Sequence, residues 1–75
     1  MNRASQATLS PNASKLAELR VSRGWTQDYV ADQVGVCRSL VANVESGRSL
    51  PSLTLALALA KLYGEPVEQL WRVEL

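Results

Sequence analysis

Apolar residues recur at intervals of three and four along most of the chain, which is the spacing of one face of an α-helix. All four glycines and all three prolines lie between these periodic segments. They divide the chain into five short helices, predicted over residues 12–23, 27–34, 38–45, 53–63 and 67–72. No alternating pattern is long enough to predict a sheet. The predicted fold class is therefore all-α, a compact five-helix bundle.

The second and third predicted helices are joined by only three residues, 35–37. Thr26 precedes the second helix, where its hydroxyl group can cap the first turn. Gly35 ends the same helix, because glycine adopts a positive φ at little cost. A tight turn containing glycine between two short helices predicts a helix-turn-helix, here over about residues 26–45.

The third helix has an apolar face and a polar face. Val41 and Val44 are predicted to point into the bundle. The opposite face then carries Arg38, Ser39, Ala42 and Asn43. Arginine and asparagine can each make two hydrogen bonds to a base edge in the DNA major groove. The same residues also suit an ordinary solvent-exposed face, and the pattern alone leaves both interpretations open.

The fourth helix is apolar on nearly every side. We assign one face to the core, namely Leu53, Ala56, Leu57 and Ala60. A helix that is apolar on both sides is normally buried on both sides. We therefore expect a homodimer interface formed by Leu55, Ala58, Leu59, Leu62 and Trp71, with residues 52–75 contributing to dimerisation. Residues 71–75 would pair there as a strand with their mate, or would instead fold over the stripe within one monomer.

Length and composition fit one small soluble domain. The chain has 75 residues, of which 47% are hydrophobic and 20% charged. It contains no run of 18 apolar residues, so no membrane span is expected. Residues 1–10 carry one positive charge and no apolar segment, which indicates a flexible tail rather than a signal peptide. We expect residues 11–75 to form the domain and the protein to be cytoplasmic.

Few residues could support catalysis or metal binding. There is one cysteine, Cys37, and no histidine. A zinc site and the commonest general base are therefore missing, and no cofactor, metal or enzymatic activity is expected.

The net charge of +1 is low for a nucleic-acid-binding protein. The charge is, however, unevenly distributed. Residues 1–48 have six basic and four acidic groups, giving +2, whereas residues 49–75 have two basic and three acidic groups, giving −1. The slightly basic part coincides with the predicted helix-turn-helix.

Seven segments of the chain resemble the phage-repressor and Cro-type (XRE-like) helix-turn-helix family. They are 16–20 (LAELR), 24–27 (GWTQ), 30–31 (VA), 34–36 (VGV), 44–48 (VESGR), 51–53 (PSL) and 60–64 (AKLYG). The resemblance covers about residues 13–71 and implies a lambda-repressor-like bundle. In that fold the third helix enters the major groove and the second crosses the DNA backbone. The implied function is a small prokaryotic or phage transcriptional regulator, a repressor that reads a palindromic operator as a homodimer.

The resemblance also implies roles for individual residues. Base contacts would come from Arg38, Ser39, Ala42 and Asn43, and backbone contacts from Gln27, Thr26, Arg48 and Leu40. Arg20 and Glu45 would form a structural ion pair. Apart from the resemblance, the apolar side chains of Trp25, Val36 and Trp71 favour a place in the core over a functional role. Cys37 departs from the usual serine or threonine cap, and its thiol is a weak acceptor.

Other functions of the same fold remain open. An antitoxin with a toxin partner and a restriction-modification controller both use this architecture. A protein-interaction module would use the apolar helix 53–63 as its docking face. Among these functions, binding to double-stranded DNA accounts for the largest number of the candidate site residues.

Overall fold

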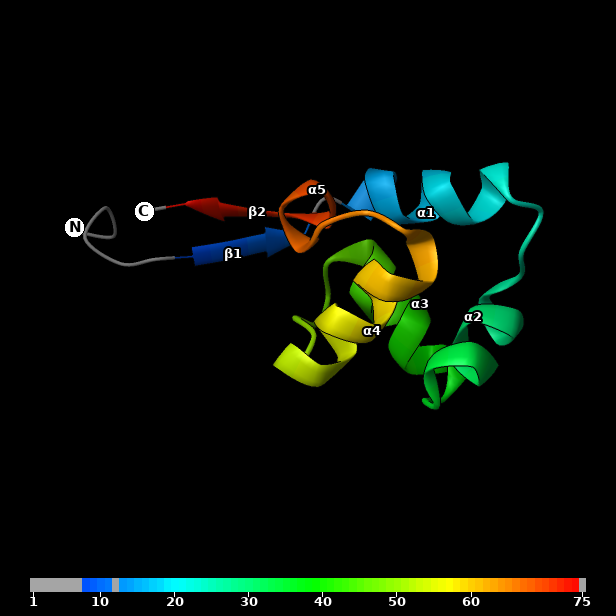
Figure 1. Cartoon of the computed structure of the whole chain (residues 1–75). Helices are drawn as coiled ribbons and strands as arrows, with labels where there is room; N and C mark the ends of the chain where they lie inside the picture. Colours follow the sequence, from blue (N-terminus) through cyan, green and yellow to red (C-terminus); the bar gives the residue numbers. More distant parts are fainter. Residues whose placement is uncertain (1–7, 12, 75) are drawn as a thin grey trace.

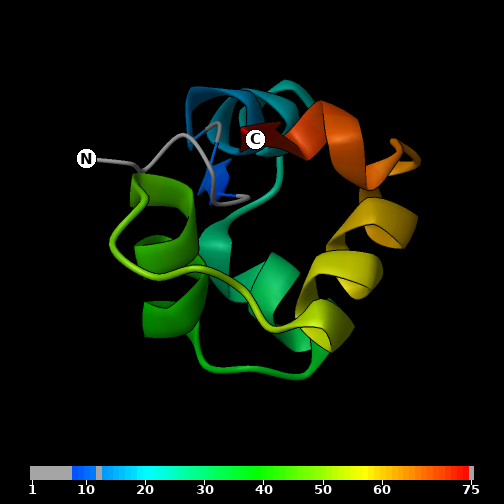
Figure 2. The same ribbon diagram turned by 90° about the vertical axis from the view of Figure 1, so that its left-hand side faces the viewer.

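A computed structural model describes residues 8–11 and 13–74 of the chain. The helices are α1 (Ala13–Ser22), α2 (Gln27–Val34), α3 (Arg38–Ser46), α4 (Leu53–Tyr63) and α5 (Val67–Leu70). Two strands, β1 (Thr8–Pro11) and β2 (Trp71–Glu74), form an antiparallel ribbon that projects from the helical body (Figure 1). Figure 2 looks along this ribbon and shows the helices arranged around one core. The ribbon makes the molecule elongated, with extents of 41 × 20 × 19 Å.

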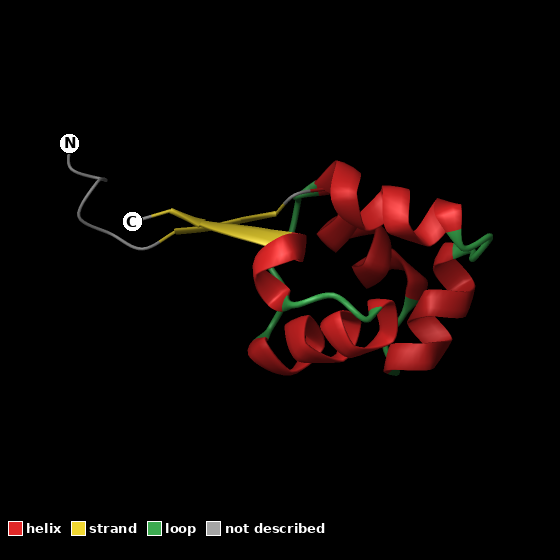
Figure 3. Cartoon of the chain, turned by 45° about the horizontal axis from the view of Figure 1, so that its top comes forward, coloured by secondary structure: helices red, strands yellow, loops and turns green. Residues whose placement is uncertain are grey.

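The ribbon corrects two expectations about the ends of the chain. Leu9 pairs with Val73 in the antiparallel register, so residues 8–10 form a strand and not a flexible tail (Figure 3). The fifth helix stops at Leu70 because the backbone of Trp71 is extended, with φ −133° and ψ 145°. The strand at 71–74 pairs with residues 8–11 of its own chain. The rest of the expected tail, residues 1–7, lies outside the described residues.

Local capping explains why the helices of the helix-turn-helix begin and end where they do. The hydroxyl oxygen of Thr26 accepts a hydrogen bond of 3.0 Å from the backbone N–H of Tyr29. At the other end of α2, Gly35 has φ +75°, a conformation that side chains disfavour. Ser52 caps α4 in the same way as Thr26 caps α2, at 3.1 Å from the N–H of Leu55. The bounds of α2 and α4 are those predicted from the sequence.

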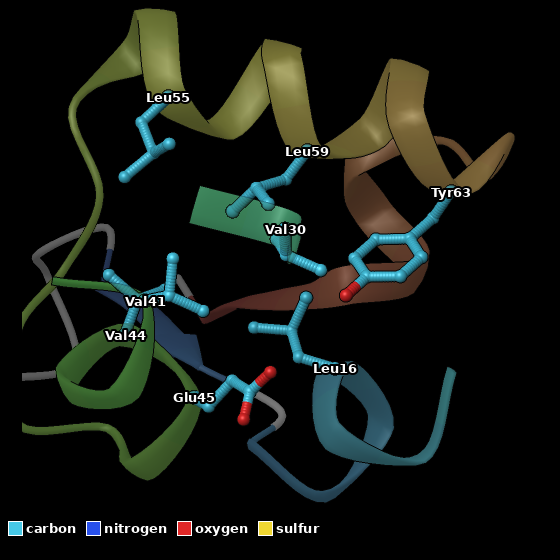
Figure 4. Close-up of a pocket in the computed structure, with 8 residues that line it drawn as sticks. All are labelled: Leu16, Val30, Val41, Val44, Glu45, Leu55, Leu59 and Tyr63. Carbon is cyan, nitrogen blue, oxygen red and sulfur yellow. The ribbon is translucent and has the colours of Figure 1, made fainter. Parts of the chain in front are cut away.

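The core lies at the centre of the bundle and draws one or more side chains from every helix. Val41 and Val44 of α3 are buried, as predicted, and pack against Leu16 and Val30. The cavity that remains between them measures about 10 Å³, the lower limit for a single water molecule (Figure 4). The centre of the bundle is therefore packed core and not a ligand site. The longest described helix, α4, has 11 residues, and no described helix is long and apolar enough to cross a bilayer.

The expected core face of α4 is only partly correct: Ala56 is buried and Ala60 packs against the core, as predicted, but the leucines are exchanged between the two faces. Leu55 and Leu59, assigned above to a dimer interface, are 6% and 5% exposed, because α2 and α5 pack against that side of α4. Leu53 and Leu57, assigned to the core, are 74% and 53% exposed. Trp71 is fully covered by its own chain. The predicted interface is therefore wrong at Leu55, Leu59 and Trp71.

The other two residues of the predicted interface have an intermediate position. Ala58 and Leu62 are half-buried and line an open hollow beside Gln33 and Val34 of α2. Leu62 also packs against the core. Their role in an interface stays a prediction.

Candidate nucleic-acid interface

The third helix turns its polar face away from the core. Val41, Val44 and Glu45 are buried on the inner side. The residues predicted to contact bases lie on the other side: Arg38 and Ser39 are exposed, and Ala42 and Asn43 are half-buried. In Figure 2, α3 forms one edge of the bundle. The structure thus gathers the predicted base-contact residues on one helix face.

A buried ion pair fixes the inner side of this helix. The Arg20 guanidinium of α1 donates to both carboxylate oxygens of Glu45, at 2.7 and 3.2 Å. It also donates to the backbone oxygen of Trp25 at 3.0 Å. The hydrogen bonds that Arg20 donates to Glu45 raise the pKa of Arg20 above its ordinary value. The expected structural ion pair is present, and it ties α1 and the segment before α2 to the end of α3.

The same carboxylate also reaches the polar face of α3 through Gln27. The side-chain amide of Gln27 donates to Glu45 at 3.0 Å, and its carbonyl oxygen accepts from Arg38 at 3.1 Å. The amide therefore has its donor side oriented by Glu45 and its acceptor side available to Arg38. The sequence assigns Gln27 only to the DNA backbone. Nothing in the sequence pattern indicates the contact with Arg38, because the two residues come from different helices.

Arg38 has a second, weaker partner on α2. Its Nε lies 3.8 Å from the Asp28 carboxylate, and both side chains are largely exposed. An ion pair of this kind contributes little energy because water screens it. The Arg38 side chain is thus oriented by α2 but remains free to exchange partners. Asp28 is not among the predicted site residues.

The predicted backbone-contact residues flank this face of α3. Thr26, Gln27 and Arg38 line an open hollow of about 470 Å³ at the start of α2. Leu40 is half-buried against the core, and Arg48 is exposed just after α3. The backbone N–H of Arg48 donates to the carbonyl oxygen of Asn43 at 2.8 Å, which fixes the turn that carries it.

Arg23 is exposed, but its side chain is held against the ends of α1 and α4. Its guanidinium donates to the backbone oxygen of Tyr63 at 2.7 Å. It also lies 5.6 Å from the ring centre of Trp25 and 5.3 Å from that of Tyr63, within cation–π range. These contacts join the end of α1 to the end of α4. They also give Trp25 the packing role that the sequence predicts.

Cys37 begins α3 without providing a side-chain cap. Its backbone has the extended conformation of a capping residue, yet its thiol makes no capping hydrogen bond. The thiol instead lies 3.3 Å from the hydroxyl of Ser39, and this contact lowers the pKa of Cys37. The loss of capping expected from the cysteine is therefore confirmed: α3 begins without a side-chain cap.

Comparison with known proteins agrees with this geometry. The helix-turn-helix family model HTH_3 matches residues 16–70. The chain is 38% identical over 61 residues to the HTH-type transcriptional regulator YgzD of Bacillus subtilis, covering 81% of this chain and 92% of that protein. It is 38% identical over 58 residues to the phage CTXphi transcriptional repressor RstR of Vibrio cholerae, covering 77% of this chain but only 52% of RstR.

Solved structures give the same result for the fold. The restriction-modification controller C.AhdI of Aeromonas hydrophila superimposes with a TM-score of 0.69 at 33% identity, over 76% of this chain and 86% of C.AhdI. The transcriptional regulator VanUg gives a TM-score of 0.69 at 24% identity, over 97% of this chain and 95% of VanUg. The matched family segment contains α2, the turn and α3 complete. The chain belongs to the HTH_3 (XRE-type) family of DNA-binding helix-turn-helix transcriptional regulators.

Proposed function

We propose that the protein is a sequence-specific regulator, a repressor, that reads a palindromic operator as a homodimer with α3 in the major groove. The observation that carries this proposal is the orientation of α3. Its buried side holds Val41, Val44 and Glu45, so Arg38 and Ser39 point outward from a rigid support. A side chain held in place reads a base edge with less loss of conformational freedom than a mobile one.

Arg38 is the principal base reader in this proposal. A guanidinium can donate two hydrogen bonds to the O6 and N7 atoms of guanine, which discriminates by about 1–3 kcal/mol against other bases. Its present partners, Gln27 and Asp28, lie on α2 and orient it from one side. Ser39, Ala42 and Asn43 lie beside Arg38, and the four residues together are called the reading face below. The side-chain amide of Asn43 can make two hydrogen bonds to adenine.

Backbone contacts fix the register of the helix on the duplex. The start of α2 carries Thr26 and Gln27 at its positive end, where a phosphate is favoured. Arg48 lies beyond the other end of α3 and supplies a cation. Leu40 would lie against the backbone beside the turn.

The small surface that one copy can bury on DNA favours a homodimer. A single module of this kind buries only about 600–1,000 Å² on DNA. Two copies with their α3 helices about 34 Å apart would read the two halves of a palindrome, and the linkage raises the overall affinity.

Selection of bound duplexes from a random pool, followed by salt titration, tests the proposal. We expect an enriched palindrome, and an affinity for it that falls linearly on a log–log plot by about 0.9 per phosphate neutralised. Enrichment of no sequence, or binding that does not depend on salt, would contradict the proposal.

A second candidate is a controller of a restriction-modification operon. It is favoured by the similarity to C.AhdI, which extends over 86% of that protein. The two candidates make the same DNA contacts and differ in the genes controlled. Binding to DNA directly upstream of adjoining methyltransferase and nuclease genes would identify the controller.

A further inference from the structure

Asp28 lies beside the proposed base reader and carries the wrong charge for contact with DNA. It is in the first turn of α2, next to Gln27, and its carboxylate lies 3.8 Å from Nε of Arg38. It lines the same open hollow as Thr26, Gln27 and Arg38. An acidic residue in the first turn stabilises a helix, but a carboxylate on a surface that approaches phosphates opposes binding to any DNA. The position of Asp28 therefore bears on how Arg38 selects its partner.

Asp28 and Gln27 hold the Arg38 guanidinium from the side of α2, through two of its nitrogen atoms. Nη1 donates to the side-chain carbonyl oxygen of Gln27 at 3.1 Å, and Nε is the atom closest to the carboxylate of Asp28. A guanidinium has five N–H groups in a rigid plane, so three remain for another partner. The edge of guanine needs two of them. By this count, Arg38 can bind guanine without giving up either contact with α2.

The charge of Asp28 distinguishes a base edge from a phosphate. A phosphate bound to Arg38 would lie close to the carboxylate, and the two negative charges would repel each other. The O6 and N7 atoms of guanine are neutral acceptors, so the carboxylate opposes them much less. Asp28 would thereby prevent Arg38 from acting as a phosphate contact on any sequence.

Contact with DNA would strengthen the pair of Arg38 and Asp28. In the free protein water screens it, because the two side chains are 59% and 81% exposed. A bound duplex displaces water, and the attraction between two charges rises as the dielectric constant falls. The carboxylate would therefore orient Arg38 most strongly when the guanidinium is in the groove.

We propose that Asp28 is a positioning residue that sets the specificity of Arg38 for guanine and lowers the affinity for non-specific DNA. This inference rests on the proposed function, because it requires α3 in the major groove with Arg38 at a base. It adds a specificity-determining residue on α2, outside the reading face. Asp28 acts through Arg38 and makes no contact with a base.

Asp28→Ala tests the inference, with Asp32→Ala as the matched control. Asp32 is exposed on the same helix one turn later, so both variants lose one negative charge. The readout is the ratio of affinities for the selected duplex and for the same duplex changed at the base whose preference Arg38→Ala abolishes. We expect Asp28→Ala to lower this ratio about five-fold, the size of a single ion-pair contribution, and Asp32→Ala to keep it. An unchanged ratio in Asp28→Ala, or an equal loss in both variants, would overturn the inference.

A double-mutant cycle tests whether Asp28 acts through Arg38. In an Arg38→Ala background, the addition of Asp28→Ala should leave the ratio unchanged, because the group that Asp28 positions is gone. A further loss of preference would mean that Asp28 acts on the DNA itself, and the inference would fall. A purely structural role would not move this readout, since a loss of stability lowers the affinity for both duplexes alike.

Affinity for a random-sequence duplex gives a second readout. At about 0.1 M salt, Asp28→Ala should bind such a duplex several-fold more tightly than wild type, and more tightly than Asp32→Ala. Equal or weaker binding by Asp28→Ala would contradict the repulsion of phosphate.

The inference and the proposed function can fail separately. If wild type selects a sequence and Arg38→Ala relaxes it, but Asp28→Ala does not, the inference falls and the proposed function stands. If wild type selects no sequence, the proposed function falls and takes the inference with it.

Discussion

At the scale of single residues, Glu45 is the group that connects the buried side of α3 to its polar face. Its carboxylate is buried, and it accepts hydrogen bonds from Arg20 on one side and from Gln27 on the other. Gln27 in turn accepts from Arg38. One carboxylate thereby connects the packing of α1, α2 and α3 to the position of an exposed arginine.

Removal of the Glu45 carboxylate should be strongly destabilising. Glu45→Ala leaves the guanidinium of Arg20, whose side chain is only 16% exposed, without its partner. We expect a loss of about 3 kcal/mol in the free energy of unfolding, measured by urea denaturation. Asp28→Ala, which breaks only the exposed pair with Arg38, should cost less than about 1 kcal/mol. Equal losses in the two variants would contradict the structural role of Glu45.

Tyr63 should make stability depend on alkaline pH. Burial, and then the charge of Glu45, raise the pKa of Tyr63 to about 12. In the unfolded chain the phenol has a pKa of about 10, so the unfolded state loses its proton first. The contribution of Tyr63 is therefore complete below pH 10 and is lost as the pH rises from 10 through 12.

Tyr63→Phe isolates this effect from other groups that titrate at high pH. The difference in free energy of unfolding between wild type and variant should be constant below about pH 9.5 and should shift against wild type by up to roughly 2 kcal/mol toward pH 12. A difference that stays flat to pH 12 would mean that the phenol is not buried from solvent.

At the scale of elements, α2 and α4 are capped by hydroxyl groups but α3 is not. The backbone of Cys37 has φ −80° and ψ 155°, the geometry of a capping residue, and lacks only a good acceptor. Cys37→Ser should therefore stabilise the protein by about 1 kcal/mol in urea denaturation. Ser52→Ala should cost a similar amount by removing the cap of α4. A serine variant no more stable than Cys37→Ala would show that α3 needs no cap.

The sequence predicts most of the elements because their signals are local. Thr26, Gly35 and Ser52 fix helix ends through contacts within a few residues. The two faces of α4 could not be distinguished, because leucine and alanine occupy both and periodicity carries no information when both are apolar. Burial there depends on α2 and α5, which pack on one face only.

The ribbon and the contacts of the reading face could not be predicted either, because they join residues from different elements of the chain. Leu9 and Val73 pair across nearly the whole chain, and strands of four residues are too short to show alternation. The family resemblance gives Arg38 and Gln27 as site residues. Their mutual hydrogen bond appears only once α2 and α3 are placed side by side.

At the scale of the whole molecule, the chain is nearly neutral, yet the polar side chains of α3 lie together on one face. The net charge of +1 provides little general attraction to DNA. Specific contacts must then supply an unusually large share of the preference for one site. The proposed function assigns this role to the exposed Arg38 on α3, whereas Arg48 has the same charge but lies beyond the helix.

The most direct test compares the base preferences of Arg38→Ala and Arg48→Ala by selection from a random duplex pool. Both variants lose one exposed positive charge and should bind more weakly. Arg38→Ala should lose preference at one position of each half-site, by about 1–3 kcal/mol, while Arg48→Ala should keep the wild-type sequence profile. An unchanged profile for Arg38→Ala would contradict the assignment of α3 as the reading helix.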